Sequence, residues 1–184
     1  MRRGLMGFTE NIIKLKKVPR KGWVSQVGVE TPESVADHSF GCALLAMYLG
    51  DLKGLDTEKL VRLSLLHDFH EALIGDYDAF DKQRIGEEKA KKNQQKAISE
   101  VFAGLPPKIR EKYCDLSEEY LLQETPEAKL IKQIDKLEMV LQARDYEKQG
   151  YDRGKLQVFW EGVDGAIVDS DLEAIITRLK KQRK

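Results

Sequence analysis

The histidines of this chain lie close together in its sequence. There are three in 184 residues, His38, His67 and His70, and all fall between positions 38 and 70. A lone histidine is usually a polar side chain satisfied at the edge of a core. A cluster favours a metal site, because neutral imidazole is the commonest nitrogen ligand of divalent metals in proteins.

The stretch LLHDFHEALIGD (65–76) places an aspartate directly after the second histidine. Adjacent residues of a helix point about 100° apart, so His67 and Asp68 do not share one face. They can still bind one metal if another helix supplies the opposite ligand. His38, which follows SVAD near the start of the preceding predicted helix, is placed to do so.

A fourth ligand is expected from the apolar run KLIKQIDKLEMVLQA, which contains Asp135. A carboxylate there is costly to bury unless a positive group pairs with it. A salt bridge to Lys132 or Lys136, or simple exposure, would also explain it. Because the other three candidate ligands need a partner, metal ligation is the better interpretation.

The expected donor set is therefore two imidazoles and two carboxylates, without a thiolate. Mixed nitrogen and oxygen ligation suits Mn²⁺, Co²⁺, Ni²⁺, Fe²⁺ or Zn²⁺, and Mg²⁺ less well. Four protein ligands leave positions for water and substrate on a metal that prefers six. Such a metal lowers the pKa of a bound water and polarises a phosphoryl oxygen. The pattern predicts a hydrolytic centre.

The elements that must position these residues are predicted to be helices. Apolar residues recur at helical spacing nearly throughout, and no alternating run is long enough for a sheet. Helices are expected over 8–15, from Ser34 to the GDLKGLD segment, and over 57–75, 106–123, 126–150 and 170–184, with a loop that becomes a charged helix between 77 and 104. Asp56 or Thr57 and Thr125 are the expected N-caps. The predicted fold is an all-α helical bundle with its metal site between helices.

Composition excludes several classes of function. Lys plus Arg equals Asp plus Glu, at 31 each, so the chain lacks the basic field that broad nucleic-acid binding requires. Its charge runs are ordinary solvated helix faces. No apolar stretch approaches a membrane span or signal peptide. Cys42 and Cys114 have no metal-like spacing, so free thiols in the cytoplasm are expected.

Taken together, His38, His67–Asp68 and Asp135 resemble the signature of the HD-domain metal-dependent phosphohydrolases, an all-α family. GWVSQVGVETPESVADHS, LLHDFHEALIGD and TPEAKLIKQIDKLEMVLQARDYE are similar to its 5′-deoxynucleotidase branch. The resemblance covers about 16–150. It implies one HD domain over 1–184, with a helical extension over 151–184, and a homodimer. The apolar LQVFW segment could contribute an interface or cover the core.

The resemblance also implies roles for individual residues. One divalent metal would be bound by His38, His67, Asp68 and Asp135. Glu71 and Asp76 match catalytic residues of the branch, which removes phosphate from deoxyribonucleoside 5′-monophosphates. Arg20, Trp23, Asp68, Asp76 and Asp135 are the expected substrate contacts.

Each of these roles has a structural alternative. Glu71 could be a solvated helix residue, Asp76 a turn residue and Trp23 a core residue. Lys21 could replace Arg20 as the phosphate ligand. His70 either orients His67 or is structural. After its GD dipeptide the chain reads YDAFDKQ, which departs from the proline-containing loop of bacterial members of the branch.

Two other functional hypotheses remain at this level. Another HD-type phosphohydrolase, a nucleoside triphosphohydrolase or a phosphodiesterase, would use the same ligands. Two-metal phosphodiesterases need further histidines, and only His70 is spare. A catalytically silent nucleotide-binding module would keep the fold but would have no need of Glu71. The predicted function is a metal-dependent 5′-deoxynucleotidase acting on a small-molecule substrate.

Overall fold

Helices make up all the regular structure of the computed structural model, which describes residues 2–183. In chain order the elements are α1 (Arg2–Leu15), the π-helical turn η1 (Trp23–Val27), α2 (Val35–Lys53), α3 (Thr57–Leu66), α4 (Glu71–Ile74), α5 (Ala79–Ile85), α6 (Glu87–Val101), α7 (Pro107–Leu122), α8 (Pro126–Lys148), α9 (Arg153–Glu161) and α10 (Ser170–Arg183). No β-strand occurs within residues 2–183, where an isolated bridge pairs Pro19 with Ser34. The predicted all-α class is confirmed.

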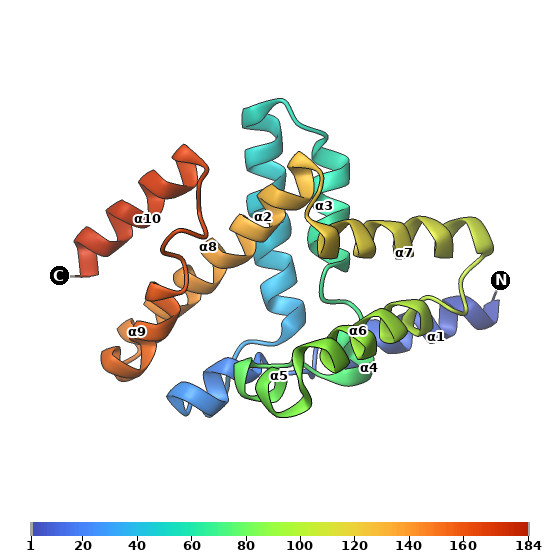
Figure 1. The fold of residues 1–184 in the computed structure, drawn as a ribbon, viewed down its shortest axis with the longest axis horizontal. Coiled ribbons are helices and arrows are strands. Elements are labelled where there is room, and N and C mark those ends of the chain that lie inside the picture. Colours follow the sequence, from blue (N-terminus) through green and yellow to red (C-terminus); the bar gives the residue numbers. More distant parts are fainter. Residues whose placement is uncertain (1, 184) are drawn as a thin grey trace.

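Helices α2 and α8 cross near the centre of the molecule, with α3 beside α2 (Figure 1). Helices α9 and α10 lie on the C-terminal side, whereas α1, α4, α5 and α6 gather at one edge. One hydrophobic cluster runs through the fold and includes Leu15 of α1, Leu137 of α8 and Leu179 of α10. None of the helices between residues 2 and 183 combines the length and apolarity needed to cross a membrane.

The start of α2 is fixed by a capping box, as its sequence predicts. The Ser34 hydroxyl accepts a hydrogen bond from the Asp37 amide at 3.1 Å, and the Asp37 carboxylate accepts one from the Ser34 amide at 2.9 Å. These contacts satisfy amides that the first turn of a helix leaves unpaired. Just before the cap, the Arg20 amide donates to the Glu33 carbonyl at 3.0 Å. The segment that carries Arg20 is therefore held beside the first turn of α2, which carries His38.

The single helix predicted over 57–75 is wrong. Helix α3 ends at Leu66, and a turn over 67–70 separates it from α4. The cause is a side chain: Nδ1 of His67 lies 2.7 Å from the carbonyl oxygen of Ser64, the acceptor that a continuing helix would offer to the Asp68 amide. The next backbone hydrogen bonds join residues only three apart, such as that from the Glu71 amide to the Asp68 carbonyl at 3.0 Å. His67 and Asp68 therefore sit in a break between helices.

The loop expected after the GD dipeptide contains a helix of its own. Asp78 caps α5 by accepting from the Asp81 amide at 2.8 Å, and Gly86 separates α5 from α6 with a φ of +88°. Helix α1 begins at Arg2, ahead of the predicted residue 8, and α9 was not predicted as a helix. The predicted caps are found. Asp56 caps α3 and Thr125 caps α8. The helix predicted over 170–184 is α10, and position 184 falls outside the described residues.

Removing the α2 cap should loosen the element that carries His38. We expect Ser34→Ala to lower the free energy of unfolding by about 1 kcal/mol, the usual cost of losing a serine cap. Ser99→Ala, on an exposed face of α6, should change it by less than about 0.5 kcal/mol. Chemical denaturation of both variants measures this. Equal stabilities would show that the capping box does not define the start of α2.

Candidate functional site

The structure brings together the four predicted ligand residues, which come from three parts of the chain. His38 lies in the first turn of α2, His67 and Asp68 in the break after α3, and Asp135 in the middle of α8. Nε2 of His38 is 3.3 Å from Oδ1 of Asp135, and Nε2 of His67 is 3.1 Å from Oδ2 of Asp68. The two imidazole rings are 5.4 Å apart between centroids.

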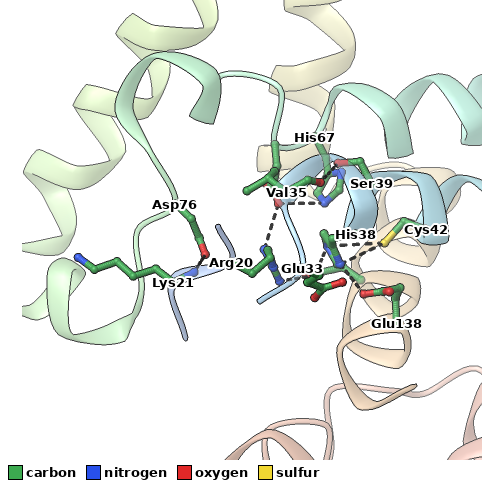
Figure 2. Close-up of polar contacts among 12 residues, drawn as sticks. Arg20, Lys21, Glu33, Val35, His38, Ser39, Cys42, His67, Asp76 and Glu138 are labelled. Atoms are coloured by element: carbon green, nitrogen blue, oxygen red, sulfur yellow. Dashed lines mark hydrogen bonds and ion pairs between the residues drawn. The ribbon is translucent and has the colours of Figure 1, made fainter. Parts of the chain in front are cut away.

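Both imidazoles are held by their Nδ1 atoms. Nδ1 of His38 lies 2.5 Å from a carboxylate oxygen of Glu138, and Nδ1 of His67 faces the Ser64 carbonyl. Because these partners are acceptors, each Nδ1 carries the proton and donates it. Each Nε2 then keeps a free lone pair. Figure 2 shows His38 in contact with both Glu138 and Cys42, with His67 nearby.

Arg20 is the positive side chain that reaches both predicted carboxylate ligands. Its guanidinium lies 3.4 Å from Asp68 and 3.9 Å from Asp135. Burial acts against the charged arginine, but Asp76, Asp68 and Asp135 together raise its pKa above the usual value. Burial likewise opposes ionised Asp68, and the neighbouring His67 and Arg20 nevertheless hold the pKa of Asp68 well below its usual range. Both residues are therefore charged.

Asp135 has a second set of partners on its far side. Lys132 reaches it at 3.5 Å from the preceding turn of α8, and the Tyr120 hydroxyl lies 3.5 Å from the same oxygen. Burial opposes its ionisation, but its close contact with His38 and the charge of Lys132 keep the pKa of Asp135 well below its usual range. The Tyr120 ring also packs edge-on against His67 at 5.1 Å. Tyr120 thus braces two predicted ligands.

Glu71 and Asp76 are two further acids that lie close enough to Asp68 for its charge to affect them. Glu71 is buried at the start of α4, and its Oε2 has no hydrogen-bond partner. Burial, followed by the charges of Asp68 and Asp76, raises the pKa of Glu71 well above its usual value. Burial also raises the pKa of Asp76, although Arg20 acts in the opposite direction. A carboxyl whose pKa is raised toward neutrality is suited to proton transfer at physiological pH.

Cys42 lies next to the histidines but is not oriented as a ligand. Its sulfur is within 4.8 Å of donor atoms of His38 and His67. However, it is 3.6 Å from Nε2 of His38 and 3.9 Å from Nδ1, nearly equidistant from the two nitrogens, so it does not lie along the lone pair of either. Burial raises the pKa of the Cys42 thiol to about 11. The thiol packs on the imidazole and stays protonated at neutral pH.

Trp23 lies in the core and not at the surface of the site. Its ring is 1% exposed and packs 4.1 Å from Phe159 and 5.2 Å from Tyr146 between centroids. The indole N–H donates to Glu33 at 2.9 Å, and the Glu33 carboxylate lies close to His38 and Glu138. The direct substrate contact expected of Trp23 stays a prediction. The polar side chain that Trp23 contacts is Glu33.

The third histidine is also buried. Nδ1 of His70 has no hydrogen-bond partner, and burial lowers its pKa to about 4. It is therefore neutral at physiological pH. Being neutral and enclosed at the end of the turn over 67–70, His70 contributes no charge to the site.

Comparison with known proteins places this arrangement in a family. The profile described as "HD domain" matches residues 12–174. The chain is 35% identical over 181 residues to a human protein named 5′-deoxynucleotidase HDDC2, covering 98% of this chain and 87% of that protein. A Dictyostelium discoideum protein of the same name is 36% identical over 181 residues, covering 93% and 94%.

The chain belongs to the HD-domain family. A solved structure of a conserved hypothetical protein from Pyrococcus furiosus agrees, with a TM-score of 0.78 and 31% identity, covering 96% of this chain and 99% of that chain. The fold and the family predicted from the sequence are both confirmed.

The side chains of this HD-domain site fit a divalent ion. Ligand atoms roughly 2.1 Å from one ion and at right angles to each other lie about 3 Å apart, close to the separations within the His38–Asp135 and His67–Asp68 pairs. Nε2 of His67 is buried and has no hydrogen-bond partner. A cation is the partner that would satisfy a buried lone pair beside two ionised carboxylates.

One contributor to the site was missed from the sequence. Glu138 lies three residues after Asp135, on the same face of α8, and orients His38. The available signal was a second acid within the same apolar run, at a helical spacing from the first. What the sequence did not reveal is that this face of α8 meets the first turn of α2.

The contact between His38 and Glu138 should influence metal binding. We expect Glu138→Gln, which keeps the shape but loses the charge, to weaken Mn²⁺ binding by about 10-fold, because outer carboxylates orient a ligand histidine and increase its basicity. Glu100→Gln, on the surface of α6, should leave the affinity unchanged. Titration calorimetry of both variants measures it. An unaltered affinity in Glu138→Gln would contradict this role.

Proposed function

We propose that this chain is a metal-dependent 5′-deoxynucleotidase, which hydrolyses deoxyribonucleoside 5′-monophosphates to a deoxynucleoside and phosphate. The observation that carries the proposal is one compact buried site containing two oriented imidazoles, two ionised carboxylates, a charged arginine and a carboxyl with a raised pKa. Named 5′-deoxynucleotidases that align with nearly the whole chain support the choice of substrate.

The metal would be held by His38, His67, Asp68 and Asp135. This donor set suits Mn²⁺, Co²⁺, Ni²⁺, Fe²⁺ or Zn²⁺, and Mg²⁺ less readily. When bound, the ion supplies Lewis-acid activation of a phosphoryl oxygen and of water. Glu138 and the Ser64 carbonyl hold the two imidazole rings through Nδ1, so that both Nε2 atoms would be free to bind the ion.

Proton transfer is assigned to Glu71. Its unpartnered oxygen and raised pKa allow it to accept a proton from the attacking water and to return it to the departing 5′-oxygen. Asp76 lies near Glu71 and Asp68 and would orient the substrate. Arg20, already paired with Asp68 and Asp135, would stabilise the charge of the phosphoryl group. Burial of this set excludes bulk water and strengthens each of these interactions.

The test is phosphate release from dAMP, dGMP, dCMP, dTMP and dUMP against the matching ribonucleotides, with Co²⁺ or Mn²⁺ and with EDTA. We expect release that EDTA abolishes and that favours deoxynucleotides. Glu71→Gln should reduce kcat on the order of 10²- to 10⁴-fold, the usual contribution of a general acid–base group. Glu100→Gln serves as the surface control.

Release at the rate of a blank from wild-type protein with bound metal would contradict the proposed activity. It would favour the silent binding module. Release from triphosphates or cyclic nucleotides alone would favour another HD-type phosphohydrolase.

We also propose that the chain forms a homodimer through an apolar stripe on α2. Phe40, Leu44, Met47, Tyr48 and Leu52 are exposed at helical spacing along one side of this helix. Because the opposite side of α2 is core, the helix is apolar all round, which is typical of a helix buried on both sides. By contrast, Leu156 and Trp160 of the LQVFW segment are fully buried within the chain. This segment mainly covers the core.

A charge in the stripe should separate the subunits. We expect Leu44→Glu to be monomeric at concentrations at which the wild type is dimeric, because a buried unpaired carboxylate is costly. Val168→Glu places the same charge at an exposed apolar position before α10 and should remain dimeric. Size-exclusion chromatography with light scattering measures both. A dimeric Leu44→Glu would place the interface elsewhere.

A further inference from the structure

The segment between Gly75 and Gly86 carries Asp76 and α5, and Lys21 holds it twice. The Lys21 amide donates to a carboxylate oxygen of Asp76 at 2.7 Å. The Lys21 ammonium donates to Asp81 in the first turn of α5. Lys21 therefore joins the segment over 75–86 to the stretch of chain that carries Arg20.

Apart from the contacts of Lys21, few side-chain hydrogen bonds link this segment to the rest of the chain. It is flanked by glycines with φ values of +78° and +88°, a conformation that favours glycine and sets the chain direction at each end. Within it, the Tyr77 hydroxyl accepts a long hydrogen bond of 3.5 Å from Asn93. The position of Asp76 thus depends heavily on its neighbour across the site.

The environment of Asp81 favours its contact with the Lys21 ammonium. Its carboxylate is buried although α5 lies at the edge of the fold, and a buried carboxylate needs a positive partner. Arg84 contacts the other oxygen at 3.0 Å, but the Arg84 side chain is 77% exposed. Lys21 is the more enclosed of the two cations and the one that connects α5 to the site.

We propose that Lys21 and Asp81 are a positioning pair that fixes Asp76 against the substrate. The inference rests on the proposed hydrolase function, because Asp76 is its point of action. In Figure 2 the Lys21 side chain points away from the two histidines, while its backbone meets Asp76. Lys21 therefore acts through Asp76 and not as a ligand of the phosphate. This replaces the alternative role in which Lys21 stands in for Arg20.

The test compares variants that break the pair with a matched control. Lys21→Met and Asp81→Asn each remove one charge and keep the side-chain shape, whereas Lys21→Arg keeps the cation. Arg84→Met removes the exposed cation from the same carboxylate. The measurements are kcat and KM for phosphate release from a deoxynucleoside monophosphate, Mn²⁺ affinity by calorimetry, and amide hydrogen exchange over 75–86.

Lys21→Met and Asp81→Asn should each lower kcat on the order of 10-fold, with KM and Mn²⁺ affinity nearly unchanged, because a small displacement of a catalytic group costs rate more than binding. The double variant should be no worse than either single one, since both remove the same contact. Amide exchange over 75–86 should rise in these variants. Lys21→Arg and Arg84→Met should resemble the wild type in all measurements.

Three outcomes would overturn the pair. Additive losses in the double variant would show that Lys21 and Asp81 act separately. A rise in KM in Lys21→Met but not in Asp81→Asn would make Lys21 a phosphate ligand. Unchanged exchange over 75–86 would show that the contact does not hold the segment. Amide exchange can be measured without enzymatic activity. An inactive wild type would therefore contradict the proposed function, and the exchange data would still test the Lys21–Asp81 pair.

Discussion

The burial of several carboxylates in one place is the constraint on which the rest of this structure depends. Glu71 and Asp135 are buried, and Asp68 and Asp76 are partly buried beside them. An ionised carboxylate in a poorly solvated interior is strongly unfavourable unless positive groups and hydrogen-bond donors surround it. Arg20, the two histidines and Lys132 meet part of this requirement. A divalent ion would meet the remainder, which is why the site is suited to binding one.

The same constraint explains how the backbone is arranged around the site. Four donors must converge although helical residues diverge by about 100° per step. The chain solves this by ending α3 at His67, whose own side chain takes the Ser64 carbonyl. The turn over 67–70 then presents His67 and Asp68 together and starts α4 at Glu71. Helices α2 and α8 contribute one proposed ligand each, and Glu138 joins the two helices through its contact with His38.

The acids divide by environment into two kinds. Asp68 and Asp135 lie against positive groups and stay ionised, as their proposed role as metal ligands requires. Glu71 is buried and lies near the charges of Asp68 and Asp76, so its pKa is raised. Such a separation of pKa values among neighbouring acids is how one pocket supplies both a charged binding surface and a proton carrier. It agrees with membership of a family whose named relatives include 5′-deoxynucleotidases.

The helical class, the caps at Asp56 and Thr125, and the family could all be predicted from the sequence. Each depends on local chemistry, namely side-chain periodicity, a hydroxyl or carboxylate before a helix, or a motif of fixed spacing. It also indicated which histidines and aspartates to consider, because polar residues inside apolar runs are rare without a reason. The convergence of those residues was a prediction that only the folded chain could test.

Only the folded structure shows the break at 67–70, the burial of Trp23, the packing of Cys42 against His38 and the contacts made by Glu138 and Lys21. No glycine or proline marks the break, so helical periodicity continued through it. The decisive hydrogen bond joins a side chain to a backbone carbonyl three residues earlier. The partners of Glu138 and Lys21 lie 100 and 60 residues away in the chain. Which distant side chains meet depends on how helices pack, and a local pattern of residues does not encode that.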